Sequence, residues 1–465
     1  MIIMRSKLLI TPTFLLLTAC NLAPDFLRPS VETPSQWHDV SLAGQKTAVD
    51  PRWWQTFGST ELNRLVTEAL AYNKDLTAAK QRIEQARAQA KIAGANLWPS
   101  LGMQGEVNDT HNNRGDNQTE SGQFTVTYEV DLWRANRARR DAGSARLLSQ
   151  VFARDALQLI VMSNVGQAYF NLLALAERKR IATEFLRNVE DVLAIVEARF
   201  KAGAVSELDV VQQKTELATA RANLDLLIQQ YTLAENALAI LLGHPPQQMH
   251  FNAEDFFDVR LPEIKAWQPS SLLERRPDVR QAEMELIAAN ADIGVARAAF
   301  YPKLQLNLDS VLASPQPAGA ALLLTAGLMQ PLFQGGRLEG GLEYAKARNA
   351  ELVESYRKTI LTAFKEVEDA AAVRSNSARR LQALVDAVAK AQQAYQLSHE
   401  RYRVGLIDYQ TLLNTQRSLL TAENSQVQAR LDVMAALVQL YQALGGGWSN
   451  NALYSDGSVP VKRRP

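Results

Sequence analysis

Residues 161–200 read VMSNVGQAYFNLLALAERKRIATEFLRNVEDVLAIVEARF, and apolar side chains recur in this stretch at alternating spacings of four and three residues. Eleven of the twelve positions on this stripe are apolar, and Lys179 is the exception. A seven-residue stripe sustained over this length predicts a long helix with coiled-coil packing. Because no proline interrupts 134–201, the helix can reach about 100 Å at about 1.5 Å per residue.

The chain is a tandem duplication, because a second stripe of the same spacing covers 360–395 and other blocks recur in the same order. The offset between matching blocks stays between 200 and 203 residues. The blocks are 75–101 with 278–304, Leu132-Trp133 with Leu332-Phe333, and Arg199-Phe200-x-x-Gly203 with Arg401-Tyr402-x-x-Gly405. We therefore expect repeat one over 61–242 and repeat two over 271–444, joined by 243–270.

Each repeat contains two segments in which apolar and polar residues alternate, which is the pattern of a half-buried strand. We expect strands at about 100–109, 122–132, 303–311 and 320–331, and a polar connection over 109–121 that faces water. The strands are close to the roughly 9–11 residues that cross a bilayer as a tilted strand. A soluble β-sandwich has the same alternation, but its interior would then be lined by acidic and amide side chains.

Four strands cannot close a barrel, and open sheet edges are not tolerated in lipid. Subunits must therefore share one barrel if these strands span a membrane. Two chains would supply eight strands, whose interior is filled by side chains. Three chains would supply twelve, which leaves room for a water-filled lumen. The strand count favours a trimer if the chain forms a duct.

The first twenty residues have the features of an export signal. Arg5 and Lys7 precede a mostly apolar stretch over 8–17, which is too short to span a membrane. Leu17-Thr18-Ala19-Cys20 then resembles a bacterial lipobox. We expect 1–19 to be removed and Cys20 to carry acyl chains such as palmitate, which anchor the chain. An ordinary signal peptide with a chance cysteine is the alternative reading.

Composition and motif content exclude several classes of function. The net charge is +1, so no global field favours nucleic acid, and a mean hydropathy of -0.18 excludes a polytopic helical membrane protein. One cysteine in 465 residues excludes a disulfide framework or a thiolate metal cluster. The five histidines are scattered and no residues have catalytic spacing, so we expect neither an enzyme nor a metal or other cofactor.

Several motifs resemble the outer-membrane efflux lipoproteins of the TolC/NodT class, the OprM-like outer membrane factor family. They are Cys20-Asn21-Leu22-Ala23-Pro24-Asp25, Trp53-Trp54-x-x-Phe57, Arg275-Arg276-Pro277-Asp278, Ala296-Arg297-Ala298-Ala299-Phe300-Tyr301-Pro302 and Leu444-Gly445-Gly446-Gly447-Trp448. The resemblance implies an α+β membrane protein, a homotrimer with a coiled-coil helical barrel in the periplasm and a twelve-stranded barrel in the bacterial outer membrane. Asn21, in place of Asp, lacks the inner-membrane retention signal of bacterial lipoproteins and agrees with that location.

The same resemblance implies an equatorial domain at mid-height, which we assign to the irregular segments 20–60, 243–270 and 445–465. It also implies a periplasmic adaptor and an inner-membrane pump of the resistance-nodulation-division type as partners. The expected function is an exit duct that passively conducts drugs, organic toxicants or metal ions, and hence multidrug resistance. A type I secretion duct for proteins and a lipid-anchored coiled-coil scaffold remain alternatives.

Site residues follow from the family pattern. The two glycine turns, with Arg199 and Gly203 and with Arg401 and Gly405, are placed at the periplasmic tip, where the adaptor docks. Gly provides the backbone conformation of a tight helical turn, and making the turn is the alternative explanation for both glycines.

A constriction is expected on the last return helix. Where the family has an apolar residue, an acid and an arginine, this chain has Gln410, Asn414 and Arg417, which share one helix face. The neutral Asn414 weakens the bond to Arg417, and Asp408 is expected to supply a negative charge to Arg417 of a neighbour. We expect a periplasmic aperture held mainly by hydrogen bonds. Alternatively, Arg417 is a solvated helix residue.

Overall fold

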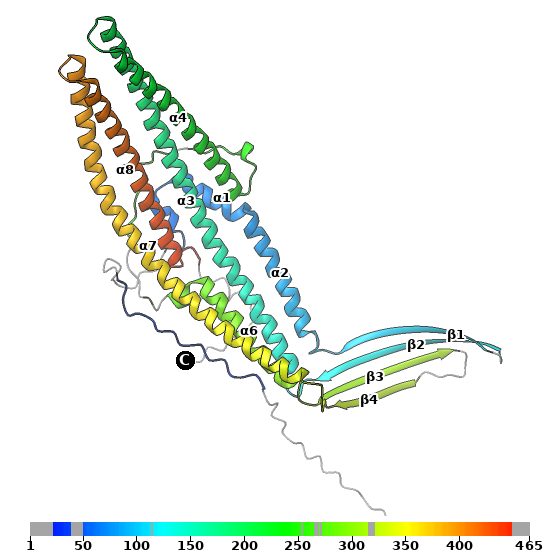
Figure 1. The fold of residues 1–465 in the computed structure, drawn as a ribbon. Coiled ribbons are helices and arrows are strands. Elements are labelled where there is room, and N and C mark those ends of the chain that lie inside the picture. Colours follow the sequence, from blue (N-terminus) through cyan, green and yellow to red (C-terminus); the bar gives the residue numbers. More distant parts are fainter. Residues whose placement is uncertain are drawn as a thin grey trace, which may run out of the picture. The chain divides into compact units, whose positions relative to one another are not determined.

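The computed structural model describes residues 22–38, 50–112, 115–252, 254–264, 269, 272–314 and 321–448. Cys20, the expected lipidation site, lies outside the described residues. Figure 1 shows the order of the elements along the chain. The short 3-10 helix η2 (Trp53–Phe57) precedes repeat one, which contains α1 (Thr60–Tyr72), α2 (Lys74–Ala95), β1 (Ser100–Asn112), β2 (Gly115–Val130), α3 (Ala135–Lys201) and α4 (Glu207–Leu242). The connection and repeat two contain η3 (Pro246–Gln248), α5 (Leu272–Arg275), α6 (Pro277–Ala298), β3 (Lys303–Ser314), β4 (Ala321–Met329), α7 (Arg337–Arg403) and α8 (Tyr409–Ala443).

The element order is the same in both repeats, which confirms the internal duplication. In each, a helix leads into a β-hairpin, a long helix and a return helix. The two long helices have the same length, since α3 and α7 each contain 67 residues. By its internal contacts the chain divides into two compact units. We call 1–29, 84–148 and 283–354 the strand unit, and 30–83, 149–282 and 355–465 the helical unit.

The strand unit contains one antiparallel sheet in the order β1-β2-β3-β4. Ser100 pairs with Thr127, Val130 with Leu304, and Lys303 with Met329. The central pair, β2 with β3, therefore joins the two repeats. Strands β1 and β4 are the edges of this sheet, and each is paired on one side only within the described chain.

The strand bounds differ from the sequence prediction. The segment 109–121 is mostly strand, because β1 continues to Asn112 and β2 begins at Gly115. Its polar residues are accommodated because backbone groups make the ladder whatever the side chain. At its other end β2 stops at Val130, since the Asp131 carboxylate accepts hydrogen bonds from the backbone N–H groups of Asn136 (2.9 Å) and Arg137 (3.0 Å) and so caps α3.

The N-terminal segment lies along α6 within the strand unit. Arg297 donates to the Leu22 carbonyl at 3.1 Å, and Asn290 donates to the Pro24 carbonyl at 2.7 Å. Gly294 permits this approach, because a Cβ at that position would lie 2.6 Å from the Cβ of Ala23. The described chain therefore begins beside the end of α6, just before β3.

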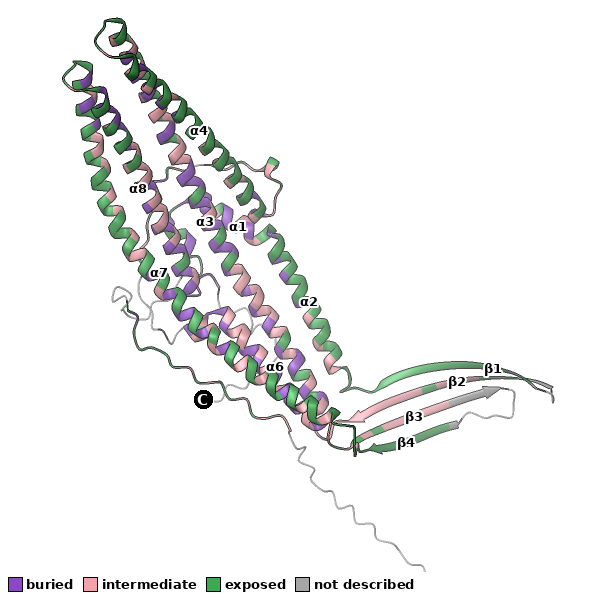
Figure 2. Cartoon of the chain, in the orientation of Figure 1, coloured by how far each residue is buried: buried purple, intermediate pink, exposed green. Residues whose placement is uncertain are grey.

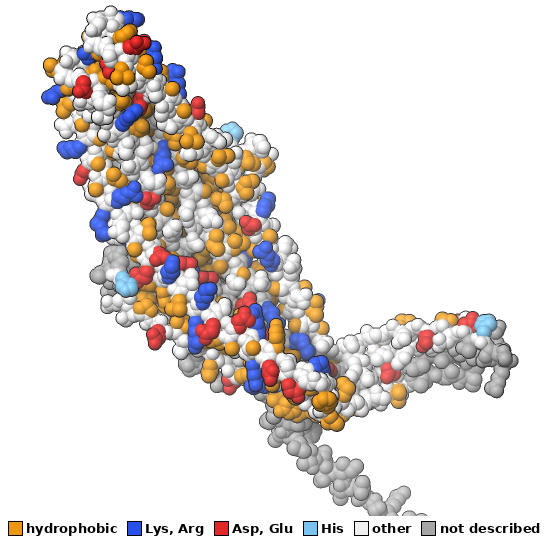
Figure 3. All heavy atoms as spheres, viewed as in Figure 1, with side chains coloured by type: hydrophobic (Ala, Val, Ile, Leu, Met, Phe, Trp, Pro, Cys, Tyr) orange, Lys and Arg blue, Asp and Glu red, His pale blue; other side chains and the backbone are white. Residues whose placement is uncertain are grey.

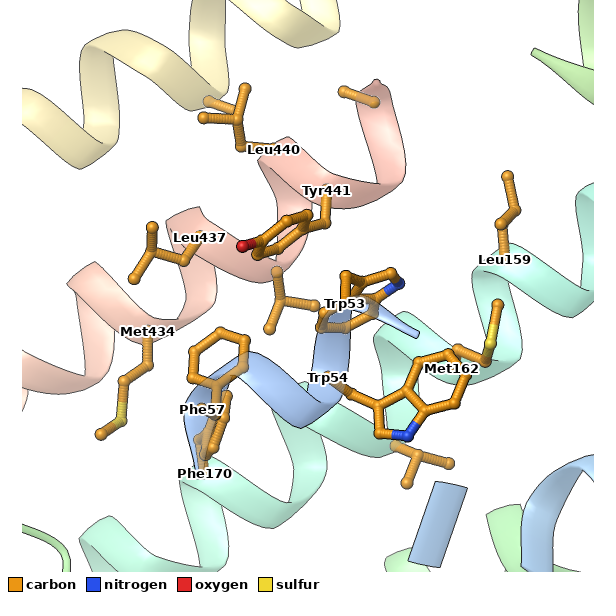
Figure 4. Packing of buried hydrophobic residues seen from close by; sticks show 14 of the residues in the cluster. Trp53, Trp54, Phe57, Leu159, Met162, Phe170, Met434, Leu437, Leu440 and Tyr441 are labelled. Atoms are coloured by element: carbon orange, nitrogen blue, oxygen red, sulfur yellow. The ribbon is translucent and has the colours of Figure 1, made fainter. Parts of the chain in front are cut away.

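The core of the helical unit lies around η2, between α3 and α8 (Figures 2 and 4). Trp53 stacks on Tyr441 with ring centroids 5.1 Å apart, and Phe57 packs against Phe170 at 4.9 Å. The segment 20–60 is thus less irregular than expected, because the spacing of Trp53, Trp54 and Phe57 directs three aromatic rings into one core.

Among the described helices, only α3 contains a stretch of 18 residues that is apolar enough to cross a membrane. Within the chain 67% of that stretch is buried, as in a core helix.

Two helices, rather than the one expected, precede the first hairpin. The break falls at Asn73, whose side chain accepts from the Leu76 N–H at 3.0 Å and donates to the Leu241 carbonyl at 2.7 Å. Nearby, Gly243 has a positive φ of 83° and lies against the Tyr72 carbonyl, where a Cβ would clash. The junction of α1 and α2 is therefore set by its contact with the end of α4.

Candidate functional site

The two turns that end the long helices have the same backbone construction. Gly203 and Gly405 have positive φ values of 73° and 82°. The Ala204 N–H donates to the Arg199 carbonyl at 2.9 Å, and the Leu406 N–H donates to the Arg401 carbonyl at 2.9 Å. These are Schellman motifs, in which glycine relieves the strain of the left-handed conformation. Both glycines therefore make the turn, whatever else they do.

We call the two turns, with the helix ends that flank them, the tip (Figure 1). Arg199 joins the two turns, because its guanidinium donates to the Tyr402 carbonyl at 2.7 Å and lies 4.8 Å from the centre of the Tyr402 ring. Its counterpart Arg401 is exposed. The repeats thus differ at equivalent positions, and Arg199 has the structural contact.

A small apolar cluster fills the tip. It consists of Val192, Val196, Val210, Tyr395, Tyr402, Tyr409, Leu412, Leu413 and Leu419. The buried side chain of Gln213 crosses this cluster, donating to the Val189 carbonyl at 2.7 Å and accepting from the Tyr409 hydroxyl at 2.6 Å. Burial raises the pKa of Tyr409, so its hydroxyl keeps the proton that it donates. Helices α3, α4 and α8 are therefore tied together by one amide whose nitrogen and oxygen each have a partner.

Arg417 has a partner that the sequence analysis missed. Its guanidinium pairs with the Glu216 carboxylate on α4, with 3.2 Å between Nε and Oε2. The Glu216 side chain is 9% exposed and that of Arg417 is 55% exposed. The hydrogen bond to Glu216 is the main reason that the pKa of Arg417 is raised. Arg417 is thus an ion-paired residue at the tip and is not simply solvated.

The other expected aperture residues have local partners. Gln410 donates to the Asn414 side-chain oxygen at 3.1 Å, so these two lie together on α8. Asp408 is the N-cap of α8 and accepts from the Thr411 N–H at 2.7 Å, which lowers the pKa of its carboxyl. Within the described chain the negative charge beside Arg417 therefore comes from Glu216, while Asp408 caps a helix.

A positional signal for Glu216 was present in the sequence. Glu216 and Arg417 lie ten and nine residues after the N-caps Ser206 and Asp408 of their helices. Because both return helices start from equivalent turns, the two residues are at nearly the same height. The sequence analysis compared Arg417 only with residues of its own helix.

A pocket of about 490 Å³ opens between the two turns. Its lining includes Arg199, Val205, Asp209, Tyr402, Asp408 and Gln410. Leu208 of the lining is an exposed apolar side chain, and so are Val404 and Leu406, which lie in the sequence between the lining residues Tyr402 and Ile407. On the face seen in Figure 3, acidic and basic side chains are interspersed, in keeping with the net charge of +1. The tip therefore offers a mixed apolar and polar surface.

Two long helices, each preceded by a β-hairpin and followed by a tight turn, agree with the expected class, a channel-forming membrane protein. The model of the outer membrane efflux protein family matches 65–244 and 268–446, one segment in each repeat, and the chain belongs to this family.

Relatives support this assignment over nearly the whole chain. The pyoverdine export outer membrane protein OpmQ of Pseudomonas aeruginosa is 38% identical, over 94% of this chain and 96% of that protein. The toluene efflux pump outer membrane protein TtgC of Pseudomonas putida is 32% identical, over 96% of each. Among solved structures, the outer-membrane channel OprN has a TM-score of 0.85 at 26% identity and covers 92% of this chain and 100% of its own.

These findings confirm the predicted fold class, a helical barrel and a transmembrane β-barrel that three subunits share, with internal duplication. The chain is an outer-membrane channel of an efflux system and extends from the outer membrane into the periplasm. The names of these relatives describe export and efflux proteins rather than enzymes.

Proposed function

We propose that three copies of this chain form the passive exit duct of a tripartite efflux system for small toxic compounds. The observation that carries the proposal is the four-stranded sheet with edges at β1 and β4, joined to two 67-residue helices. Such edges require pairing in lipid, and three sheets give twelve strands. The adaptor and the inner-membrane pump that load the duct are partners by family pattern, and the pump selects the cargo.

Relatives of stated function support small molecules as the cargo. OpmQ is named for pyoverdine export and TtgC for toluene efflux. A lumen as wide as a twelve-stranded barrel provides little selectivity of its own. We therefore assign substrate choice to the partner pump and conduction to this chain.

The adaptor docks on the two turns of the tip. Support comes from the exposed Leu208, Val404 and Leu406 beside the pocket between the turns. Gly203 and Gly405 set the backbone of this surface, Arg199 holds the turns together, and the exposed Arg401 is free to pair with an acidic group of the adaptor.

The periplasmic aperture is formed by Asp408, Gln410, Asn414 and Arg417, and Glu216 holds Arg417. The Glu216–Arg417 pair adds a full negative charge that Asn414 does not supply. An ion pair between α4 and α8 therefore contributes to closure, in addition to the hydrogen bonds that the sequence suggested.

The lipid anchor is an accessory to the barrel. The contact of Leu22 with Arg297 starts the described chain next to the helix end that leads into β3, so an acylated Cys20 two residues earlier would lie near the membrane surface. Intact-mass spectrometry of the membrane-extracted protein tests this. Acylation of Cys20 after loss of 1–19 is expected, and an unmodified Cys20 or another mature start would contradict it.

Conductance of the purified protein in a planar bilayer tests the duct. We expect stepwise current from particles whose mass, by light scattering in detergent, is that of three chains. A lipid-anchored scaffold would give no current. Co-purification with an ATP-driven exporter and a protein substrate, in place of a proton-driven pump, would favour the secretion alternative.

A further inference from the structure

The two repeats contact each other inside one chain at a specific aromatic site. Trp133, in the connection from β2 to α3, donates its indole N–H to the Pro302 carbonyl at 2.7 Å. Its ring lies 4.7 Å from that of Tyr301, which precedes β3. We call the line along which two neighbouring strands pair a seam. This contact lies at the end of the β2–β3 seam, next to the pair Val130 and Leu304. It closes the seam between repeat one and repeat two.

Among the described residues of the single chain, the equivalent positions at the outer edges of the sheet have no such contact. Trp98 and Pro99 precede β1 as Tyr301 and Pro302 precede β3, at an offset of 203. Phe333 lies in the connection from β4 to α7 as Trp133 lies in that from β2 to α3. Trp98 is 76% exposed and Phe333 is 88% exposed, whereas Tyr301 is only 38% exposed.

We infer that Phe333 of one subunit packs against Trp98 and Pro99 of the next subunit, and so closes the seam between β4 and β1. This inference rests on the three-subunit assembly of the proposed function. The occupant is a second copy of the same chain, because the same chain already contains the equivalent contact between its two repeats. Both aromatic residues lie at the same end of the sheet, since Ser100 pairs with Thr127 and Met329 with Lys303.

The chemistry of the two seams differs in one respect. Trp133 combines ring packing with a hydrogen bond from its indole N–H to a carbonyl, while the side chain of Phe333 has no N–H group to donate. Leu332, which is 92% exposed in the single chain, adds apolar surface next to it. The seam between subunits is therefore held by apolar and aromatic contact, and aromatic pairs prefer ring centroids about 4.5–7 Å apart.

Lipid is the competing neighbour for these side chains, since aromatic residues also gather at membrane–water interfaces. Contact with lipid and contact with the next subunit can be distinguished by whether a short cross-linker joins Trp98 of one subunit to Phe333 of another. Against lipid, Trp98 and Phe333 of different subunits would have no fixed distance. In the seam they would be as close as Trp133 and Tyr301 are within one chain.

Cysteine cross-linking tests the inference in the trimer. The variant Trp98→Cys/Phe333→Cys is treated with a short bismethanethiosulfonate reagent and analysed on a denaturing gel. We expect covalently linked dimers and trimers. The pair Trp133→Cys/Tyr301→Cys, expected to link within one chain and detected by its loss of free thiols, calibrates the reach of the reagent. The pair Trp98→Cys/Tyr344→Cys is the matched control, because Tyr344 is 74% exposed but lies further along α7.

A double-mutant cycle gives a second, independent readout. Trp98→Ala and Phe333→Ala should each lower the temperature at which the trimer dissociates, and the double variant should lose little more than either single one. Additive losses, or assembled trimers that fail to link while the calibration pair links, would overturn the seam contact. Failure of the unaltered chain to form trimers would instead overturn the proposed function.

Discussion

In the middle of the helical unit, Trp53, Phe57 and Phe170 are at most 1% exposed and pack between α3 and α8 (Figure 4). At the tip of the same unit, a small apolar cluster is combined with the buried amide of Gln213 and with the pair of the half-exposed Arg417 and the buried Glu216. Interior apolar packing resists deformation because each void costs contacts on all sides. A polar contact between two helices can break and be replaced by water. We therefore predict that the middle of the helical unit stays fixed and that the tip is the part that rearranges.

A buried charged group in the middle of the helical unit also holds its surroundings in place. Arg276 is buried, and its guanidinium pairs with Asp278 (2.7 Å) and Glu366 (2.7 Å) and donates to the Ala443 carbonyl at 3.0 Å. Each of its partners belongs to a different element of the helical unit. A buried charge with this many partners fixes one arrangement, because losing a partner leaves part of the buried guanidinium without a hydrogen bond.

The largest effect is expected from Trp53→Ala. Removing a fully buried indole leaves a cavity, and such changes cost about 3–5 kcal/mol. We expect a fall of that order in the free energy of unfolding, measured by denaturant titration of the detergent-solubilised protein. Tyr344→Ala, on the exposed side chain of α7, should change stability by less than about 0.5 kcal/mol. Equal effects of the two variants would show that the middle is not the fixed part.

The second-largest effect on stability is expected from Gly405→Val. At a φ of 82° a β-branched residue is strained, and left-handed backbone costs roughly 1–2 kcal/mol for a residue with a Cβ. Gly405→Asn is the matched variant, because Asn tolerates this conformation. We expect a lower unfolding temperature for the Val variant only.

The same pair of variants separates turn formation from docking. If the adaptor docks here, the Asn variant should assemble as trimers yet give weaker cross-linking to the adaptor at both turns. Normal trimers with unchanged cross-linking would leave Gly405 with a role in the turn alone.

Arg417→Ala and Glu216→Gln are expected to lower stability less than the variants above, but to change the conductance of the channel. The ion pair is partly exposed, so its contribution is about 1 kcal/mol or less. Each variant should still raise the single-channel current and the leakage of antibiotics into cells. Arg380→Ala, which breaks a comparable pair with Asp432 (3.1 Å) away from the tip, serves as the control. Properly assembled trimers with unaltered current would place the constriction elsewhere.

The smallest effect expected is a rise in channel current at low pH, caused by protonation of Asp408. Its pKa is lowered by the Thr411 N–H, so the cap stabilises α8 above the unfolded value of about 3.9 and is lost as pH falls through the folded pKa. We expect the current of the wild type to rise below pH about 4. Asp408→Asn retains a capping side chain without a titrating group and should remove that component of the rise. The same acid response in both proteins would assign it to another group.

The sequence by itself determined the long helices, the duplication and the two tight turns. These features depend on local information: an apolar stripe along one helix, the order of three repeated blocks, and glycine where the backbone needs a positive φ. The family, and with it the outer-membrane location and the efflux role, also followed from motifs that can be recognised without a structure. Local patterns were sufficient to predict these features because each pattern occurs twice in the chain, once in each repeat.

Only the tertiary structure decided which residues meet across elements. The pairing of Glu216 with Arg417 and the break at Asn73 against the end of α4 depend on a partner distant in the sequence. The continuation of β1 and β2 through a polar segment depends on the pairing of the two strands with each other. Side-chain periodicity predicts the face that a residue occupies but not the residue opposite it. The opposite residue is set by the register of packed helices and paired strands, which exists only once the chain has folded.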